Sequence, residues 1–316
     1  MANESPSVLL IGSSYLELTA NMGHIPAPGE TLTDDGGVAI LPAGAARLAV
    51  AMAKFGTTVD LLSKVGADFH GNQLYECART YGVGTDALRV DRDEPTGLIL
   101  RLRERGEAPR TALYPGANRA LLTDHIRSAF PPRNDAVLLD ADAPFQSLLM
   151  AARLAEQHGL PVLVTVGESV SPDFRPEQLP EAALVRVTEG AGCRLTGIDH
   201  PGVNDYARIA FTLFQKFRTG AVVITLGSRG AYFYDGGCAE QIATYLPTDR
   251  SSAGVFGAEE VYTAALVDAF LRSRDARKSA KIASAALSLF LTKPGGIGAF
   301  PSFEEVGNFV RAQQNH

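Results

Sequence analysis

Residues 43–65, AGAARLAVAMAKFGTTVDLLSKV, contain the repeating unit that decides the fold. Small and apolar residues recur at helical spacing over residues 43–55, and Gly56 follows as a common helix terminator. The apolar stretch at residues 59–65 predicts a strand. A helix that leads directly into a buried strand is half of a strand–helix–strand unit, the building block of parallel sheets covered by helices.

The same alternation continues along the chain. Uninterrupted apolar runs predict further strands at residues 7–12, 135–140, 161–166, 183–187 and 221–226. Helical patterns cover residues 71–81, 145–158, 205–217 and 261–271. Strands that lack polar alternation are buried on both faces. The sequence therefore predicts an α/β fold with a central, mostly parallel sheet between helices.

Residues 96–113, TGLILRLRERGEAPRTAL, break this pattern, because apolar and charged residues alternate around Arg105 and Gly106. Such alternation predicts an antiparallel hairpin with one face in water. Residues 16–33 also read as extended chain. We expect segments of about 13–40 and 96–117 to form a small β-sheet lid. Since no linker rich in Gly, Ser or Pro separates two units, we expect one domain over residues 1–316.

Composition excludes several classes of protein. A chain of 316 residues with 46% hydrophobic and 20% charged residues is not intrinsically disordered. A net charge of −6 without a long Lys/Arg run argues against nucleic acid or an anionic membrane as partner. We expect a cytoplasmic protein, because the sequence has no signal-peptide pattern, no long apolar run and only three widely spaced cysteines.

Five segments together carry a family resemblance. They are VLLIGSSYLELTANMGHIPAPGETL (8–32), LAVAMAKFGTTVDLLSKVGADFHGNQL (48–74), PTGLILRL with YPGAN (95–102 and 114–118), VVITLGSRGAYFYDGG (222–237) and TKPGGIGAFPSFEEV (292–306). In this order and spacing the chain resembles the PfkB family of ribokinase-like carbohydrate kinases. The resemblance implies a three-layer ribokinase-like fold with a β lid. It also implies phosphoryl transfer from ATP, with Mg²⁺, to a hydroxyl of a small sugar, sugar derivative or nucleoside, and a homodimer through the lid.

The family's catalytic turn is Gly-Ala-Gly-Asp at the start of a helix. Counting back without gaps from residue 292 matches it to Gly257, Ala258, Glu259 and Glu260. By resemblance, Gly257 and Ala258 form the anion turn and Glu260 is the catalytic base. Glu259 then stands where the family has glycine, and its charge would repel an incoming phosphate. An alignment with a gap instead matches residues 253–255, which contain no acid.

The substrate side also departs from the family pattern. By resemblance, Glu17 matches an acidic sugar ligand, Gly44 belongs to the substrate turn, and Asn118, at the exit of the lid, also binds the substrate. Arg47 stands where a sugar-binding Asn is expected. Two hypotheses follow: Glu17 and Arg47 form an ion pair across the sugar pocket, or Arg47 binds an anionic group of the substrate.

The nucleotide side is closer to the family. The resemblance implies nucleotide contacts by Thr225, Gly227, Ser228, Gly230 and Ser284. The family's metal-organising Asn-x-x-Glu matches residues 188–191, where both defining residues are replaced and Glu189 is the nearest acid. These departures leave a second hypothesis open, in which the chain is a catalytically impaired homologue that binds a ligand in a regulatory role.

Overall fold

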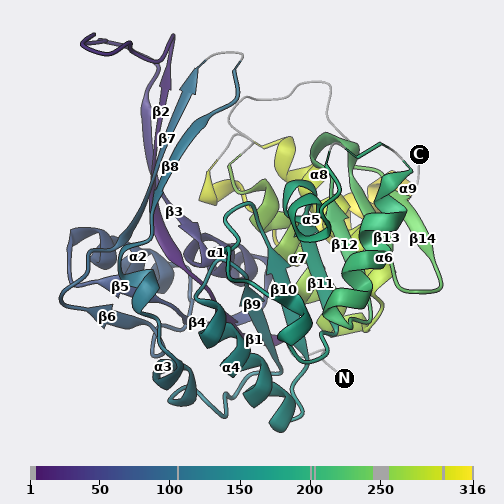
Figure 1. The fold of residues 1–316 in the computed structure, drawn as a ribbon. Coiled ribbons are helices and arrows are strands. Elements are labelled where there is room, and N and C mark those ends of the chain that lie inside the picture. The colour runs from purple at the N-terminus through teal and green to yellow at the C-terminus, as the bar shows by residue number, and fades with distance from the viewer. Residues whose placement is uncertain are drawn as a thin grey trace.

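An eight-stranded sheet forms the centre of the computed structural model (Figure 1), which describes residues 5–104, 107–199, 201–202, 204–244, 256–293 and 296–314. The strand order is β14-β13-β12-β11-β10-β9-β1-β4. The bounds are β1 (Ser7–Ile11), β4 (Thr58–Leu62), β9 (Ala136–Asp140), β10 (Val162–Val166), β11 (Leu184–Thr188), β12 (Val222–Thr225), β13 (Ala231–Tyr234) and β14 (Ala239–Ile242). The strands from β4 to β12 are parallel, and β13 and β14 add an antiparallel edge.

Helices cover both faces of this sheet. One face packs on α1 (Ala45–Phe55), α7 (Ala258–Ser273) and α8 (Ala276–Leu291), and the other on α4 (Phe145–Gln157) and α6 (Asp205–Phe217). The remaining helices are α2 (Phe69–Thr80), α3 (Thr123–Arg127), α5 (Glu189–Thr196) and α9 (Phe303–Gln314). Strand β1 illustrates the pattern, because its alternate residues belong to two separate apolar cores. The prediction of strands buried on both faces is confirmed.

One predicted strand is wrong. Residues 59–65 form two strands, because the chain leaves β4 after Leu62 and continues as β5 (Lys64–Gly66). Strand β5 pairs in parallel with β6 (Arg89–Asp91) in a separate two-stranded sheet. The Lys64 ammonium lies 2.7 Å from an Asp91 carboxylate oxygen. Leu62, Ser63 and Lys64 are all buried, so burial is continuous across the break and the apolar pattern hides it.

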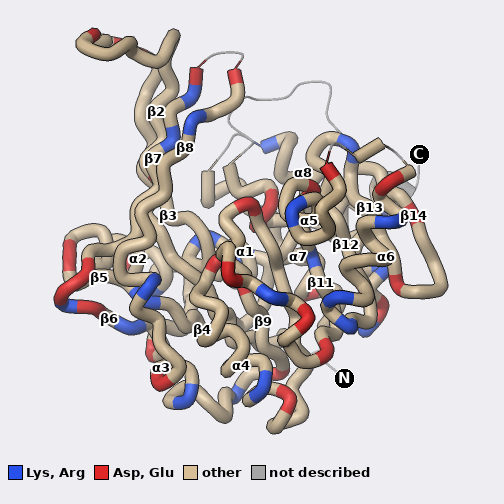
Figure 2. The backbone as a smooth tube through the Cα atoms, in the orientation of Figure 1, with Lys and Arg blue, Asp and Glu red and all other residues tan. Residues whose placement is uncertain are grey.

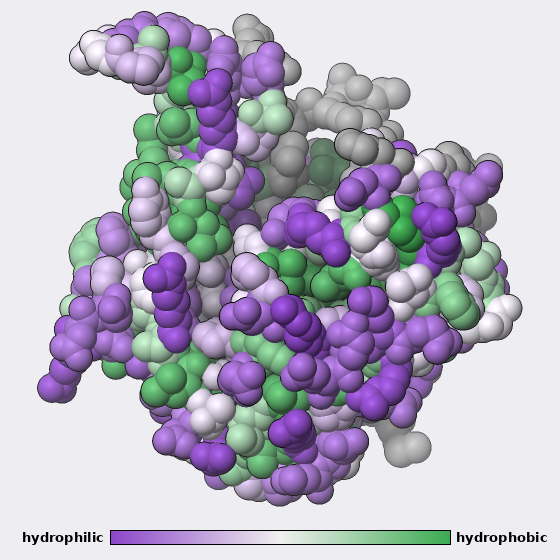
Figure 3. Space-filling model, in the orientation of Figure 1, coloured by the Kyte–Doolittle hydropathy of each residue, from purple (hydrophilic) through white to green (hydrophobic). Residues whose placement is uncertain are grey.

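A four-stranded sheet rises from the body as a lid (Figure 1), and in the space-filling view it projects above the rest of the molecule (Figure 3). Its strand order is β3 (Val38–Gly44), β2 (Ser14–Met22), β7 (Gly97–Glu104) and β8 (Arg110–Tyr114). Strands β7 and β8 form the antiparallel hairpin expected from the alternating pattern. Two predicted turns, Arg105 with Gly106 and the alternative catalytic turn at 253–255, lie outside the described residues.

Gly44 joins the lid to the body, because strand β3 passes into helix α1 at this residue. Its φ of +60° lies in the left-handed region, and a Cβ there would come within 2.4 Å of the Ser13 carbonyl oxygen. Only glycine fits such a position without strain. The close contact holds the root of the lid beside the carboxyl end of β1.

Charged residues of both signs are spread over the face of the body seen in Figure 2. Among the helices that the structure describes, none is both long and apolar enough to cross a lipid bilayer.

Candidate active site

A cavity of about 290 Å³ lies where the carboxyl ends of the central parallel strands meet the lid and the amino end of α7. Residues from all three parts line it, among them Arg47, Arg101, Asp140, Arg186, Glu259 and Glu260. Parallel α/β sheets commonly bind ligands at this edge. A larger cavity of about 760 Å³ adjoins it and shares Tyr15, Asp142 and Ser169.

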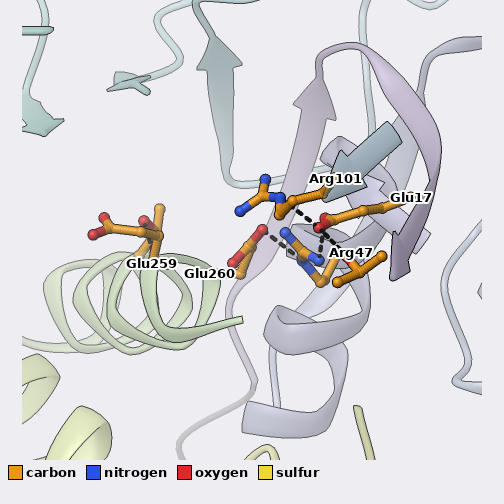
Figure 4. Close-up of polar contacts among 7 residues, drawn as sticks. Glu17, Arg47, Arg101, Glu259 and Glu260 are labelled. Atoms are coloured by element: carbon orange, nitrogen blue, oxygen red, sulfur yellow. Dashed lines mark hydrogen bonds and ion pairs between the residues drawn. The ribbon is translucent and has the colours of Figure 1, made fainter. Parts of the chain in front are cut away.

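The first turn of α7 carries two adjacent carboxylates. Gly257 caps the helix with a φ of +90°, and a Cβ there would come within 2.5 Å of the Phe300 ring. Ala258, Glu259 and Glu260 follow as the first helical residues. Figure 4 shows the Glu260 side chain directed toward the lid and that of Glu259 directed away from it. The two acids therefore act in different surroundings.

Arg47 connects Glu260 to the lid side of the cavity, which we call the acceptor side and which contains Glu17 and Arg101. The Arg47 Nε–H donates to Glu260 Oε1 at 2.6 Å, and Arg47 Nη1 donates to Glu17 Oε2 at 3.0 Å (Figure 4). Glu17 is 2% exposed. Burial acts to lower the pKa of Arg47, but the Glu260 and Glu17 carboxylates outweigh it and raise that pKa. The hypothesis of a Glu17–Arg47 ion pair is confirmed.

Arg101 of the lid strand β7 adds a second cation to this cluster. Its Nε lies 2.9 Å from Glu17 Oε1, but the N–H is not aimed well enough for a hydrogen bond. The contact is therefore mainly electrostatic. Two arginines and two glutamates thus alternate across the cavity, in the order Arg101, Glu17, Arg47 and Glu260.

Glu259 is tied to the opposite side, by Arg186. Its carboxylate forms an ion pair with the Arg186 guanidinium on β11 and accepts a 3.2 Å hydrogen bond from Thr225 Oγ1 on β12. Arg186 also donates to Thr225 Oγ1 at 2.9 Å. No motif in the sequence points to Arg186. The sequence does contain one indication of it. Arg186 is a charged residue within residues 183–187, ALVRV, whose other residues are apolar and predict a strand buried on both faces.

Two aspartates at the end of β9 also belong to no motif. Burial raises the pKa of Asp140 to about 7. The pKa of Asp142 is also raised, mainly by burial and secondly by the neighbouring Asp140 carboxylate. The Asp142 Oδ1 accepts a 3.1 Å hydrogen bond from the Ser13 N–H. Both acids line the cavity. Their signal in the sequence is two carboxylates directly after a buried strand.

Backbone groups hold the Asn118 amide. Its Oδ1 accepts from the Ser14 N–H, and its Nδ2 donates to the Ser14 and Pro115 carbonyl oxygens, all at 2.9 Å. Asn118 also lines the cavity of about 760 Å³, and its contact with a substrate stays a prediction. The amide fastens β2 of the lid to the short 3-10 helix at Gly116–Ala120.

The predicted nucleotide turn lies next to this site. The chain turns at Gly227 and Gly230, both with positive φ, and Ser228 is exposed between them. Thr225, two residues before the turn, contacts Glu259 and Arg186. Ser284 is 4% exposed within α8 and does not line the 290 Å³ cavity. Its contact with the nucleotide stays a prediction.

Metal ligands are sparse in the described part of the chain. No group of three or more His, Cys, Asp or Glu side chains there could hold a metal ion. The Glu189 carboxylate accepts hydrogen bonds from Tyr206 and Arg229, which engage both of its oxygens. These contacts disfavour the metal role predicted for Glu189.

Comparison with known proteins gives consistent matches over nearly the full chain. Residues 5–302 match the model of the pfkB family carbohydrate kinases. The ribokinase of Haemophilus influenzae is 23% identical over 308 residues, which cover 96% of this chain and 98% of that protein. Arabidopsis thaliana ribokinase, solved with ribose and ATP, superposes with a TM-score of 0.80 at 20% identity over 97% of this chain and 99% of that one. A Methanocaldococcus jannaschii nucleoside kinase gives a TM-score of 0.74 at 19% identity, covering 98% of this chain and all of the other. The predicted three-layer fold is confirmed.

Proposed function

Since the chain belongs to the PfkB family of carbohydrate kinases, we propose that it transfers the terminal phosphoryl group of ATP to a hydroxyl of a small sugar, sugar derivative or nucleoside. The observation that carries this proposal is the Glu260 carboxylate on the first turn of α7, inside a cavity bounded by the lid. Two requirements of the reaction are met at this point. The carboxylate can take the proton from the acceptor hydroxyl, and the helix start can stabilise the negative charge of the phosphoryl group.

Glu260 is the group that receives the acceptor proton. As the acceptor oxygen forms its bond to the γ-phosphorus, the bond from that phosphorus to the β-phosphate oxygen breaks and ADP leaves. The acceptor O–H proton passes to a Glu260 carboxylate oxygen. Arg47 holds this carboxylate in place, and phosphoryl transfer has a loose transition state that depends mainly on positioning and electrostatics.

The amino end of α7 is suited to the transferring phosphoryl group. The Val261 N–H donates to the Gly257 carbonyl oxygen at 2.8 Å and begins the helical hydrogen bonding. The N–H groups of residues 258–260 precede it and are those that a helix leaves for a ligand. Together with the helix dipole they favour negative charge at this point.

ATP enters this proposal as its Mg²⁺ complex. Mg²⁺ keeps several waters and is usually held by phosphate oxygens and one or two carboxylates. The nucleotide would lie along the turn formed by Gly227, Ser228 and Gly230, beside Thr225. Acceptors longer than a monosaccharide would extend into the adjoining 760 Å³ cavity.

The test is an acceptor screen. Purified protein is incubated with ATP, Mg²⁺ and ribose, deoxyribose, fructose, sugar acids or nucleosides, and ADP release is followed. We expect release that requires one class of acceptor and that Glu260→Gln abolishes, whereas Glu304→Gln, which alters an exposed acid on α9, leaves it unchanged. No release with any acceptor, together with no ATP binding by calorimetry, would overturn the proposal. ATP binding without release would favour the regulatory homologue.

We also propose a homodimer formed through the lid. Strands β3 and β8 are the two edges of the lid sheet, and unpaired edges are ready to pair with another strand. Val38 and Ile40 on β3 are 65% and 52% exposed. Apolar side chains this exposed on an edge strand suit contact with a second copy of the chain.

A further inference from the structure

Arg186 places a full positive charge inside the central sheet. All five residues of β11 are buried, and Arg186 is 4% exposed. Burial lowers the pKa of its guanidinium to about 10, opposed by neighbouring carboxylates that include Glu260, Asp140 and Glu168. It therefore stays protonated at neutral pH. A buried arginine of this kind needs strong partners, because an unpaired buried charge is costly.

The partners of Arg186 leave part of its hydrogen-bonding capacity unused. The guanidinium contacts Glu259 and Thr225, but its Nε–H has no partner within the part of the chain that the structure describes. Arg186 lines the cavity together with the first residues of α7. A buried cation that lines a cavity and has an unpartnered donor is suited to binding an anion.

The Glu259 side chain differs from Arg186 in its freedom to move. It is 49% exposed, so it can rotate toward solvent without disturbing the core. Its carboxylate occupies the space between Arg186, Thr225 and the first turn of α7, which is the space where a helix start favours an anion. Carboxylate and phosphate bind a guanidinium in the same bidentate manner.

We propose that Arg186 is a phosphoryl-binding residue and that the Glu259 carboxylate occupies its site as a substitute anion until a phosphate displaces it. This inference rests on the proposed function. The neighbouring Thr225 leads into the Gly227–Gly230 turn, which favours the terminal phosphate of a nucleoside triphosphate as the displacing group. Displacement also removes the repulsion that a fixed Glu259 would exert on that phosphate.

Binding without acceptor tests the inference independently of turnover. ATP and ADP are titrated by calorimetry into wild type, Glu259→Gln, Arg186→Lys and Arg186→Met. We expect Glu259→Gln to bind ATP about tenfold more tightly, because the competing charge is gone, and Arg186→Met to bind ATP about tenfold more weakly. The affinity for ADP, which lacks the terminal phosphate, should change less than threefold in both variants. Glu177→Gln, which removes a surface partner of Lys216, is the matched control.

The other possible outcomes of these titrations also decide for or against the inference. Unchanged ATP affinity in both Glu259→Gln and the Arg186 variants would overturn the inference, and acceptor-dependent turnover would then leave the proposed function intact. If Arg186→Met does not fold, Arg186→Lys and the partly exposed Glu259→Gln decide the question alone. A ribose 5-phosphate titration separates the sources: loss of its binding in Arg186→Lys with ATP affinity unchanged would overturn the assignment to the nucleotide phosphate.

Discussion

Arg47 and Glu260 lie 213 positions apart in the sequence, and in the folded protein the Arg47 Nε–H donates a 2.6 Å hydrogen bond to Glu260 Oε1. This contact joins α1 to α7 across the cavity, and the second contact of Arg47 holds the buried Glu17. One guanidinium thus fixes both acids on the acceptor side.

Arg47→Met should destabilise the protein strongly. It leaves the 2% exposed Glu17 with the imperfectly aligned Arg101 as its one cation and with a 3.0 Å hydrogen bond from Thr19 Oγ1, and losing one partner of a buried pair costs about 3 kcal/mol or more. Urea unfolding measures the change. Arg127→Met removes an exposed pair with Asp124 and should cost less than about 1 kcal/mol. Equal losses in the two variants would contradict the role given to Arg47.

Glu260→Gln should lower kcat by about 100-fold or more, because the amide cannot accept the acceptor proton. Its carbonyl oxygen still accepts from Arg47, so the fold and the KM for ATP should change little. Steady-state kinetics with the acceptor found in the screen measure both constants. A variant that retained full kcat would show that another group takes the proton.

Asp140 should make stability depend on pH. Burial raises its pKa in the folded protein to about 7, above the value of about 4 for an unfolded aspartate. The folded state then binds more protons between these values, so stability falls as pH rises from about 4 to about 7, by at most about 1.4 kcal/mol per pH unit.

Urea unfolding at pH 5, 6 and 7 checks this dependence. Asp140→Asn has no proton to lose and should flatten the slope, whereas Asp124→Asn at an exposed position should not. Parallel slopes in wild type and Asp140→Asn would show that Asp140 ionises normally.

Asn118→Ala should loosen the root of the lid. It removes three buried hydrogen bonds to Ser14 and Pro115, at a cost of about 2 kcal/mol or more. Hydrogen exchange of the lid strands should rise more than exchange of β9 and β10. Uniform change across both sheets would argue against a local role.

A double substitution of Val38 and Ile40 by Glu should convert the proposed dimer to a monomer, because charges on an edge strand oppose pairing. Light scattering after gel filtration measures the mass. Wild type that is monomeric at all concentrations would contradict the dimer. Thr80→Glu, an exposed change at the end of α2, is the control.

The sequence predicted the elements of the fold well, because each depends on a local pattern. Apolar runs gave the central strands, and the spacing over residues 43–55 gave α1. The break at Ser63 escaped because both flanking strands are buried, although they belong to different sheets. A pattern of burial does not record which sheet buries a residue.

The candidate site was only partly predictable. The Glu17–Arg47 contact followed from two family positions that share one pocket. Arg186 and Asp140 belong to no motif used above, and their importance depends on contacts with distant strands and helices. Asn118 matched a motif position, yet its amide serves the backbone, which only the three-dimensional arrangement reveals.

Strand β3 passes into α1 at Gly44 without a loop, and Arg47 lies on the first turn of that helix. The lid strands and the packed helix therefore meet at one residue. Glu17 and Arg101 belong to the lid strands β2 and β7, whereas Arg47 belongs to the buried helix α1 beside Glu260. A tilt of the lid about Gly44 would separate Glu17 from Arg47 and leave the Arg47–Glu260 pair in place, so that only a closed lid completes the row of alternating charges.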